Sequence, residues 1–288
     1  IIIFGKLGHD HNGRFLYDKV FVESEHVRSL IAQKYPDKAD RLVVASDLVI
    51  ERLIRNRLGR KEALLRYRLD PGKKTVLIVS TWGDSLLSRS RGVIVDVVRE
   101  LCASYNVVVS LHPKTVHKTD DKYDPACHEL HRFCDGRNGC LCIDNGTWKS
   151  LVPYCDYLIA DYSSAVFYAL PFVSGVVLLD IPTVKFWKDS PMLKLRMNAT
   201  VIGSLSESAE ALRRETVESK KEVYRELGRT LFGEYRDAMR IHEKTVCALL
   251  GLKVSDENKE ETNERPETAA EAGEYDKPVH VHAHDFVI

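Results

Sequence analysis

Polar side chains that suit phosphate chemistry stand directly after three apolar runs of the sequence. They are Thr81 and Trp82 after residues 75–80, His112 after residues 106–111, and Asp161, Ser163 and Ser164 after residues 157–160. Hydroxyl groups and an imidazole can each donate a hydrogen bond to a phosphate oxygen. If the three runs are strands of one parallel sheet, their carboxyl ends share the edge where ligands bind in such sheets. The sequence therefore predicts one crevice in which these side chains meet.

Some of these residues also have a simpler interpretation. Ser163 is placed to cap a helix expected at residues 164–173, which contributes about 1 kcal/mol without any ligand. The same helix start would also attract a phosphate through its unpaired N–H groups and its dipole. Trp82 is most simply a core aromatic residue, and contact with a nucleotide base or ribose is the alternative. For His112 we favour a functional role, because it ends a strand and precedes Pro113.

The sequence lacks the motifs of several common nucleotide and hydrolase sites. It has no Walker A loop, no G-x-G-x-x-G, no G-x-S-x-G elbow and no H-E-x-x-H. Without a glycine loop to hold phosphates, ATPases and classical dinucleotide-binding enzymes are disfavoured. We expect neither a metal ion nor a cofactor.

Seven cysteines, an odd number without a secretory signal, favour a reducing, cytoplasmic setting. One segment combines four of them with two histidines: Cys127, His128, His131, Cys134, Cys140 and Cys142. A zinc site is one interpretation, but the spacing lacks the C-x2-C knuckle that is typical of such sites. We therefore expect free thiols, buried or half-buried, in this segment.

Apolar runs alternate with amphipathic segments along most of the chain. The expected strands are residues 1–4, 19–22, 42–45, 75–80, 106–111, 141–143, 157–160 and 176–179. The first expected helices are one capped by Ser24 and a long one from Ile50 to Leu58. Further helices are expected at residues 93–101, 124–133, 164–173 and 204–214, the last with a capping box at Ser204 and Glu207. Residues 217–251 are expected to form one or two more helices, with possible breaks at Gly228 and Gly233. Strands that are nearly all apolar and alternate with helices indicate a parallel sheet covered on both faces.

A known family shares several of these segments. Residues 156–167 read D-Y-L-I-A-D-Y-S-S-A-V-F and closely resemble the D-x-L-I-T-D-Y-S-S-x-x-F signature of CDP-glycerol glycerophosphotransferases, the GT-B-fold enzymes of teichoic-acid synthesis. Four other segments follow in the family's order. Residues 46–53 are similar to its G-x-P-x-x-D-R-L motif, residues 80–84 to its P-T-W-R-D motif, and residues 111–113 to its L-H-P motif. Residues 232–250 are similar to its closing helix. Glu51, Ser80 and Gly83 replace the Asp, the Pro and the Arg of these motifs. The resemblance covers residues 1–250.

The resemblance implies a fold, an activity and a set of site residues. The fold would be α/β and GT-B-like, a parallel sheet with helices on both faces and an incomplete amino-terminal domain. The activity would be transfer of a phosphoglycerol unit from CDP-glycerol, or a related donor, to a hydroxyl on a cell-wall polymer or a lipid-linked primer. The implied site residues are His112 at the leaving phosphate and Thr81, Trp82, Asp161, Ser163 and Ser164 around the donor.

One catalytic motif of the family is not matched. Its H-G-T-P-L-K motif, whose histidine is taken as the catalytic base, falls at residues 5–13, where His9 and His11 are the candidates to replace it. The family's Pro ahead of the next strand is replaced near Ser174 and Gly175. The resemblance therefore implies donor recognition in this chain more strongly than it implies catalysis. A glycosyltransferase or epimerase that uses a UDP-sugar on the same fold, and a non-catalytic nucleotide-binding remnant, are the alternatives.

The resemblance, together with the change of composition near residue 254, implies a division of the chain. We expect residues 1–54 to be a remnant of an acceptor-side domain, 55–74 a linker helix and turn, 75–203 the nucleotide-donor domain, 204–253 terminal helices, and 254–288 a disordered acidic tail. The opening I-I-I-F, without an initiator Met, predicts a strand entered in mid-protein.

The net charge of zero hides an asymmetry. Residues 255–288 hold 3 basic and 10 acidic side chains, which leaves +7 on the first 254 residues. The net charge of zero argues against general nucleic-acid binding. The mildly basic body suits a phosphate-bearing ligand or an anionic membrane surface. No apolar run approaches the roughly 20 residues of a membrane span. We expect a cytoplasmic protein whose membrane contact, if any, is peripheral, at the inner face of the cell membrane.

Overall fold

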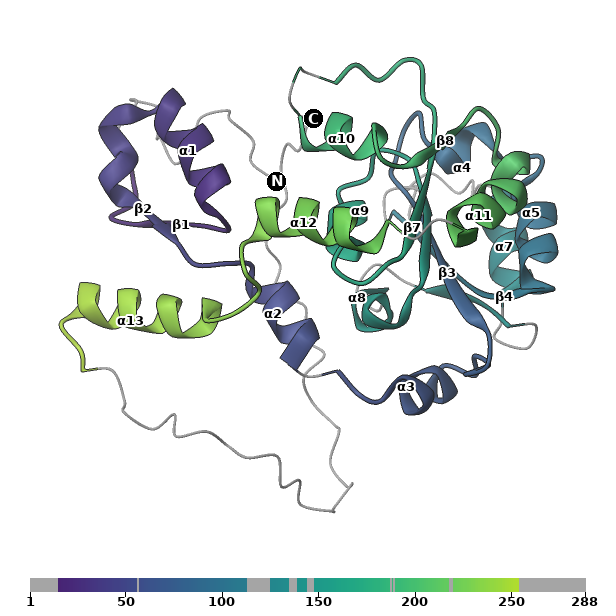
Figure 1. Ribbon diagram of the computed structural model, residues 1–288, viewed down its shortest axis with the longest axis horizontal. Coiled ribbons are helices and arrows are strands. Elements are labelled where there is room, and N and C mark those ends of the chain that lie inside the picture. Colours follow the sequence, from purple (N-terminus) through teal and green to yellow (C-terminus); the bar gives the residue numbers. More distant parts are fainter. Residues whose placement is uncertain are drawn as a thin grey trace.

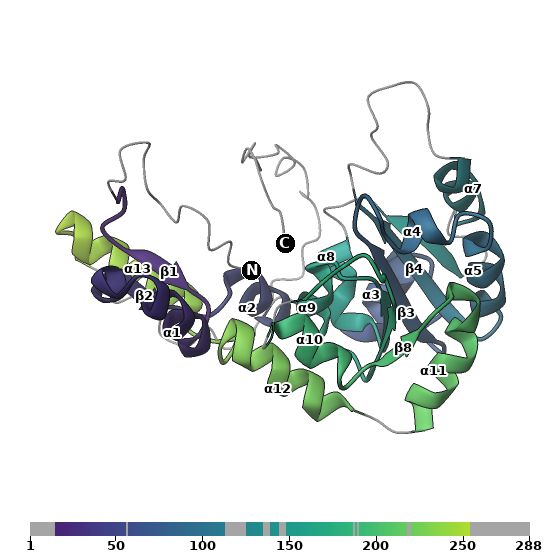
Figure 2. The same ribbon diagram turned by 90° about the horizontal axis from the view of Figure 1, so that it is seen from above.

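Two parallel sheets organise the chain (Figures 1 and 2). The computed structural model describes residues 15–55, 57–112, 125–134, 139–143, 148–186, 188, 190–217 and 220–253. A small sheet pairs β1 (Val20–Val22) with β2 (Leu42–Val44). The expected strand at residues 1–4, the segment that holds His9 and His11, and the tail from residue 254 lie outside the described residues.

The larger sheet has six parallel strands in the order β5-β4-β3-β6-β7-β8. They are β3 (Lys74–Ser80), β4 (Tyr105–Leu111), β5 (Cys140–Ile143), β6 (Tyr157–Ala160), β7 (Gly175–Leu179) and β8 (Thr200–Ile202). From β3 the chain builds outward in one direction through β4 and β5, and then returns to the other side of β3 for β6, β7 and β8. The strand order therefore reverses between β3 and β6, and such a switch point is where doubly wound sheets bind ligands.

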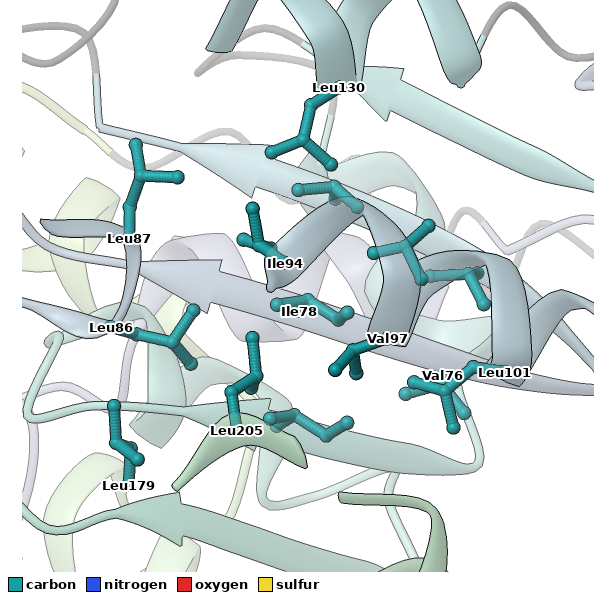
Figure 3. Close-up of a cluster of buried hydrophobic side chains, with 14 of the residues drawn as sticks. Val76, Ile78, Leu86, Leu87, Ile94, Val97, Leu101, Leu130, Leu179 and Leu205 are labelled. Carbon is teal, nitrogen blue, oxygen red and sulfur yellow. The ribbon is translucent and has the colours of Figure 1, made fainter. Parts of the chain in front are cut away.

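Helices cover both faces of the larger sheet, as expected. Alternate residues of β3 face opposite sides: Val76 and Ile78 belong to one buried cluster, and Leu77 and Val79 to the other. The first face is covered by α5 (Ile94–Cys102), α7 (Pro125–Phe133) and α11 (Ser208–Val217), and the second by α3 (Arg60–Arg66), α8 (Trp148–Leu151), α9 (Ala165–Ala169) and α12 (Lys221–Phe232). Figure 3 shows the first cluster, in which Ile94, Val97 and Leu101 pack onto the strands.

The remaining elements are short or lie near the small sheet. They are α1 (Glu25–Lys34), η1 (Pro36–Arg41), α2 (Leu48–Arg55), α4 (Leu86–Arg89), η2 (Val152–Tyr154), α10 (Pro191–Arg196), η3 (Leu205–Glu207) and α13 (Ala238–Leu250). Ser24 caps α1 by accepting the N–H of Val27, and the capping box of Ser204 and Glu207 is present. Both caps confirm the sequence prediction.

Two helix predictions were wrong in extent. The single helix from Ile50 to Leu58 is divided into α2 and α3, because Gly59 takes an extended conformation at the N-cap of α3. The helix expected at residues 164–173 ends at Ala169, since a proline at position 171 cannot continue it. Of the two possible breaks in residues 217–251, the one at Gly233 is confirmed, because α12 ends at Phe232. Gly228 lies buried inside α12, where a Cβ would collide with the hydroxyl of Tyr235.

The two parts of the molecule are joined by α12 and by the chain around residues 46–51. In both views α12 lies between the small sheet and the larger one. Ser24 Oγ donates to the carbonyl of Thr230 over 2.6 Å, and the N–H of Asp47 donates to the carbonyl of Phe232 over 3.1 Å. Past Gly233 the chain turns into α13, where the His242 ring stacks on Phe21 with centroids 3.9 Å apart.

The cysteine prediction is corrected at one pair. Cys134, after α7, and Cys140, in β5, form a disulfide with their Cα atoms 4.6 Å apart. The pairing of β5 along β4 brings the two residues together, and the N–H of Cys142 also donates to the Cys134 carbonyl over 3.1 Å. The described cysteines that form no disulfide are Cys102, Cys127, Cys142, Cys155 and Cys247.

The described part of the chain contains no group of three or more His, Cys, Asp or Glu side chains arranged to hold a metal ion. None of its helices combines the length and the apolar character needed to cross a bilayer.

Candidate functional site

A pocket of about 250 Å³ lies where the strand order reverses, at the carboxyl ends of β3, β4 and β6. It is lined by Val79, Ser80, Ser110, Leu111, His112, Trp148, Lys149, Ser163, Ser164, Ala165 and Tyr168. The three strands are adjacent in the sheet, so side chains as far apart in sequence as Val79 and Tyr168 meet at one edge. This is the edge that the strand-end residues indicated.

Three of the sequence-predicted site residues line the pocket, and three do not. His112 enters from the end of β4, and Ser163 and Ser164 enter from the loop between β6 and α9. Thr81, Trp82 and Asp161 lie next to the pocket without lining it. His9 and His11 fall outside the described residues.

Asp161 lies beneath the pocket and is only 2% exposed. Its carboxylate accepts the N–H of Thr81 at 2.9 Å, the N–H of Leu86 at 3.0 Å and the N–H of Ser163 at 2.9 Å. It also accepts the hydroxyl of Ser80 at 3.2 Å. Burial raises the pKa of Asp161 above its usual value, although these hydrogen bonds act in the opposite direction. Asp161 therefore holds together the segments that carry the site.

Trp82 is not a core residue, so the simpler interpretation of this residue was wrong. It is 44% exposed, and its ring centroid lies 6.3 Å from that of His112 at a tilt of 46°. Gly83 follows with φ of 83°, a conformation that favours glycine and turns the chain at the end of β3. The hydroxyl of Tyr162 donates to the carbonyl of Asp84 over 2.7 Å and so fixes this turn. Trp82 thus stands as an exposed aromatic face beside the imidazole.

The two serines of the loop between β6 and α9 differ in the hydrogen bonds that their side chains make. Ser163 Oγ accepts the N–H of Ala165 at 3.3 Å, which is a partial cap of α9. Ser164 is the N-cap residue, yet its side chain makes no capping hydrogen bond and is exposed. Because α9 has only five residues, its dipole is short, and a phosphate would rely on the hydroxyls more than on the helix.

Sequence reasoning missed four polar lining residues. They are Ser80, Ser110, Lys149 and Tyr168. Ser80 and Ser110 were readable as single polar residues at the ends of otherwise apolar strands, and Ser110 shares a strand face with His112. Lys149 gave no signal, because its helix α8 is four residues long.

Tyr168 connects the pocket to the small part of the molecule. Its ring lies 6.1 Å from that of Trp148 and 5.0 Å from that of Phe232, and its hydroxyl is hydrogen-bonded to Asp47. Burial and the charges of Asp47 and Glu23 raise the pKa of Tyr168, so its hydroxyl stays protonated. One wall of the pocket is therefore fixed by the chain that leads to α2.

The chemistry of the lining suits an anion. Its polar groups are five hydroxyls, one imidazole and one ammonium, and no carboxylate lines the pocket among the described residues. Hard divalent cations prefer carboxylate oxygens, whereas hydroxyls and an ammonium donate hydrogen bonds to phosphate. The geometry therefore fits a phosphate-bearing ligand held without a metal ion.

Solved structures with a similar fold include two structures of one variant of the wall teichoic acid polymerase TagF and a co-structure of S. aureus MnaA with UDP. The TagF variant soaked with CDPG for 30 minutes has a TM-score of 0.54 at 15% identity, over 82% of this chain and 56% of that chain. The structure of the same TagF variant without the CDPG soak has a TM-score of 0.55 at 15% identity, over 82% of this chain and 57% of that chain. The MnaA–UDP structure has a TM-score of 0.50 at 14% identity, over 83% and 62%.

These likenesses show the fold, which is GT-B-like with helices on both faces of a parallel sheet. The chain spans a little over half the length of the TagF chains that it matches. No protein-family model matches the sequence, and no curated protein matches it by sequence.

Proposed function

We propose that the chain is a glycerophosphotransferase-like enzyme that moves a phosphoglycerol unit from CDP-glycerol to a hydroxyl acceptor in cell-wall polymer synthesis. The observation that carries the proposal is the pocket at the switch point, whose described lining holds no carboxylate and where His112 meets Ser163 and Ser164. The D-Y-S-S segment that resembles the family supplies both serines. The similarity to TagF soaked with CDPG supports the same choice of donor.

The reaction breaks one bond of the donor diphosphate and forms one new phosphodiester. The acceptor oxygen attacks the phosphorus that carries glycerol, the bridging oxygen leaves with CMP, and the acceptor proton passes to a base. Negative charge grows on the leaving phosphate, where His112 and the two serine hydroxyls would donate hydrogen bonds. Trp82, exposed beside His112, would pack against the base or the ribose.

The acceptor side of the reaction needs a base of suitable pKa. A hydroxyl has a high pKa, so a positioned group must take its proton in the transition state, and histidine suits this at neutral pH. His9 and His11 are our candidates. An acceptor on a lipid-linked primer would place the enzyme at the inner face of the cell membrane.

A glycosyltransferase or epimerase that uses a UDP-sugar is the second candidate. The similarity to MnaA in complex with UDP favours it, because the fold alone does not choose between the two nucleotides. Both donors have a pyrimidine base and a diphosphate, so the same pocket would hold either.

Thermal unfolding in the presence of CDP, UDP and ADP separates these functions. A ligand at about 100 times its Kd stabilises the fold by about 2.7 kcal/mol, which is readily measured. We expect CDP to raise the Tm more than UDP, and ADP to have the smallest effect. A larger shift with UDP would favour the second candidate, and no shift with any of the three would contradict nucleotide binding. CDP binding without transfer from CDP-glycerol would indicate a non-catalytic nucleotide-binding protein.

A further inference from the structure

Lys149 carries the only formal positive charge among the described residues that line the pocket. It lies in α8, half-buried, on the same pocket as His112, Ser163 and Ser164. Within the part of the chain that the structure describes, it forms no ion pair with a carboxylate. An ammonium group that no described carboxylate pairs with, in a partly enclosed pocket, favours an anionic ligand.

The neighbouring residue fixes where this charge lies. Trp148 is 6% exposed and packs edge-to-face on Tyr168, with ring centroids 6.1 Å apart. The Nζ of Lys149 lies 6.0 Å from the centroid of the Trp148 ring, which is within the range of a cation–π contact. Because Trp148 is packed in the pocket wall, this contact places the ammonium beside the pocket.

We propose that Lys149 is a phosphate-binding residue that neutralises the diphosphate of the donor in place of a divalent cation. It would donate hydrogen bonds to phosphate oxygens from the side of α8, while Ser163 and Ser164 donate from the loop after β6. The same charge would stabilise the nucleotide phosphate as it leaves. This inference rests on the proposed function for the identity of the ligand, but not for its charge.

The test compares Lys149→Met and Lys149→Arg by calorimetric titration with CDP and with inorganic pyrophosphate, in EDTA. A charged hydrogen bond of this kind corresponds to a loss of affinity of about 10–100-fold, so Lys149→Met should weaken both ligands by that factor. Lys149→Arg should keep most of the affinity, because the charge remains. Lys61→Met, an equal change of charge on an exposed residue of α3 outside the pocket, is the matched control and should bind like the parent.

A second measurement follows the affinity of each protein as a function of salt, so that a general loss of affinity in a variant is not mistaken for the loss of the charge. The affinity of the parent for pyrophosphate should fall as salt is added, and that salt dependence should be weaker in Lys149→Met or in Lys149→Gln.

The outcomes separate this inference from the proposed function. If the parent binds CDP and Lys149→Met binds it equally well, the role of Lys149 is overturned and the function stands. If pyrophosphate binds through Lys149 but neither CDP nor UDP binds, the proposed function is overturned and the anion site stands. If the parent binds none of the three, both are overturned.

Discussion

The carboxylate of Asp161, at the end of β6, accepts the backbone N–H of Thr81, at the end of β3, over 2.9 Å. These two strands flank the point where the strand order reverses. The same carboxylate accepts the N–H of Ser163, whose side chain lines the pocket, and that of Leu86, which begins α4. One buried acid therefore fixes the relative positions of the loops that bear Trp82 and the serines. Asp161 is a positioning residue, and the ligand itself would contact the residues that Asp161 holds in place.

Replacing Asp161 by Asn tests this role. An amide offers one oxygen instead of two and turns an N–H group toward backbone donors, so the free energy of unfolding should fall by about 1–3 kcal/mol. The loss should also depend on pH. Burial raises the pKa of Asp161 in the folded state, so the contribution of the protonated carboxyl is full below the unfolded value of about 3.9 and is lost as pH rises through the folded pKa.

The stability advantage of the parent over Asp161→Asn should therefore shrink as pH rises from about 4. Urea unfolding of both proteins at several pH values measures it. An advantage that grows with pH would show that the carboxylate is stabilised when charged, which would contradict the direction of the shift.

The two serines should respond differently to replacement by Ala. Ser163 partly caps α9 and faces the pocket, so Ser163→Ala should lower both stability and nucleotide affinity, each by about 1 kcal/mol. Ser164 makes no capping bond with its side chain, so Ser164→Ala should weaken the affinity for CDP by about 5–30-fold and leave the Tm unchanged. Calorimetry and thermal unfolding separate the two effects. Unchanged affinity in both variants would remove the serines from the site.

Residues near the ends of apolar strands were the part of the site that sequence reasoning could find. A polar residue that follows a buried strand, as His112 follows β4, must lie at the sheet edge whatever the side-chain details. The direction of Trp82 was not readable, because it depends on the turn at Gly83. The role of Asp161 was not readable either. A residue just after a strand can point into the pocket or beneath it, and the N–H groups around the side chain determine which of the two it does.

The fold was readable where the hydrophobic pattern was strong and local. β6 coincides with the predicted residues 157–160, because four consecutive apolar residues lie between polar neighbours. β8 and α10 were missed, since β8 has three residues and packs at the sheet edge, and α10 has six. The disulfide between Cys134 and Cys140 depends on how β5 returns beside α7, which spacing alone does not reveal.

Gly175, at the start of β7, is required by packing. A Cβ at this position would lie 2.7 Å from the Cβ of Glu215 and 3.1 Å from the Tyr157 ring. Glu215 is buried and fixed by Tyr224 and Lys220, so it cannot move aside at little cost. Gly175→Ala should therefore lower the free energy of unfolding by about 1–3 kcal/mol.

The matched control for this change is Gly92→Ala, because no atom lies within 4 Å of a Cβ built there. Its stability should stay within about 0.5 kcal/mol of the parent, as for an ordinary surface change. Equal stabilities for the two variants in denaturant would show that the strand can shift to accept the methyl group.

Nucleotide binding should not require a divalent cation. The described lining of the pocket offers hydroxyls, an imidazole and an ammonium, which bind phosphate directly. We expect the Kd for CDP to be the same before and after treatment with EDTA. Loss of binding in EDTA with recovery on adding magnesium would contradict this and would direct attention to carboxylates outside the pocket.

The most direct measurement is a single-turnover transfer with CDP-glycerol labelled in glycerol and a glycerophosphate primer. The account predicts one CMP released for each labelled unit joined to the primer. His112→Ala should slow this step by about 10²–10⁴-fold, whereas His128→Ala, on the exposed side of α7, should not. If the parent binds CDP-glycerol but transfers nothing, or if His112→Ala transfers at the parental rate, the pocket at the β3–β6 switch point is not the site of this reaction.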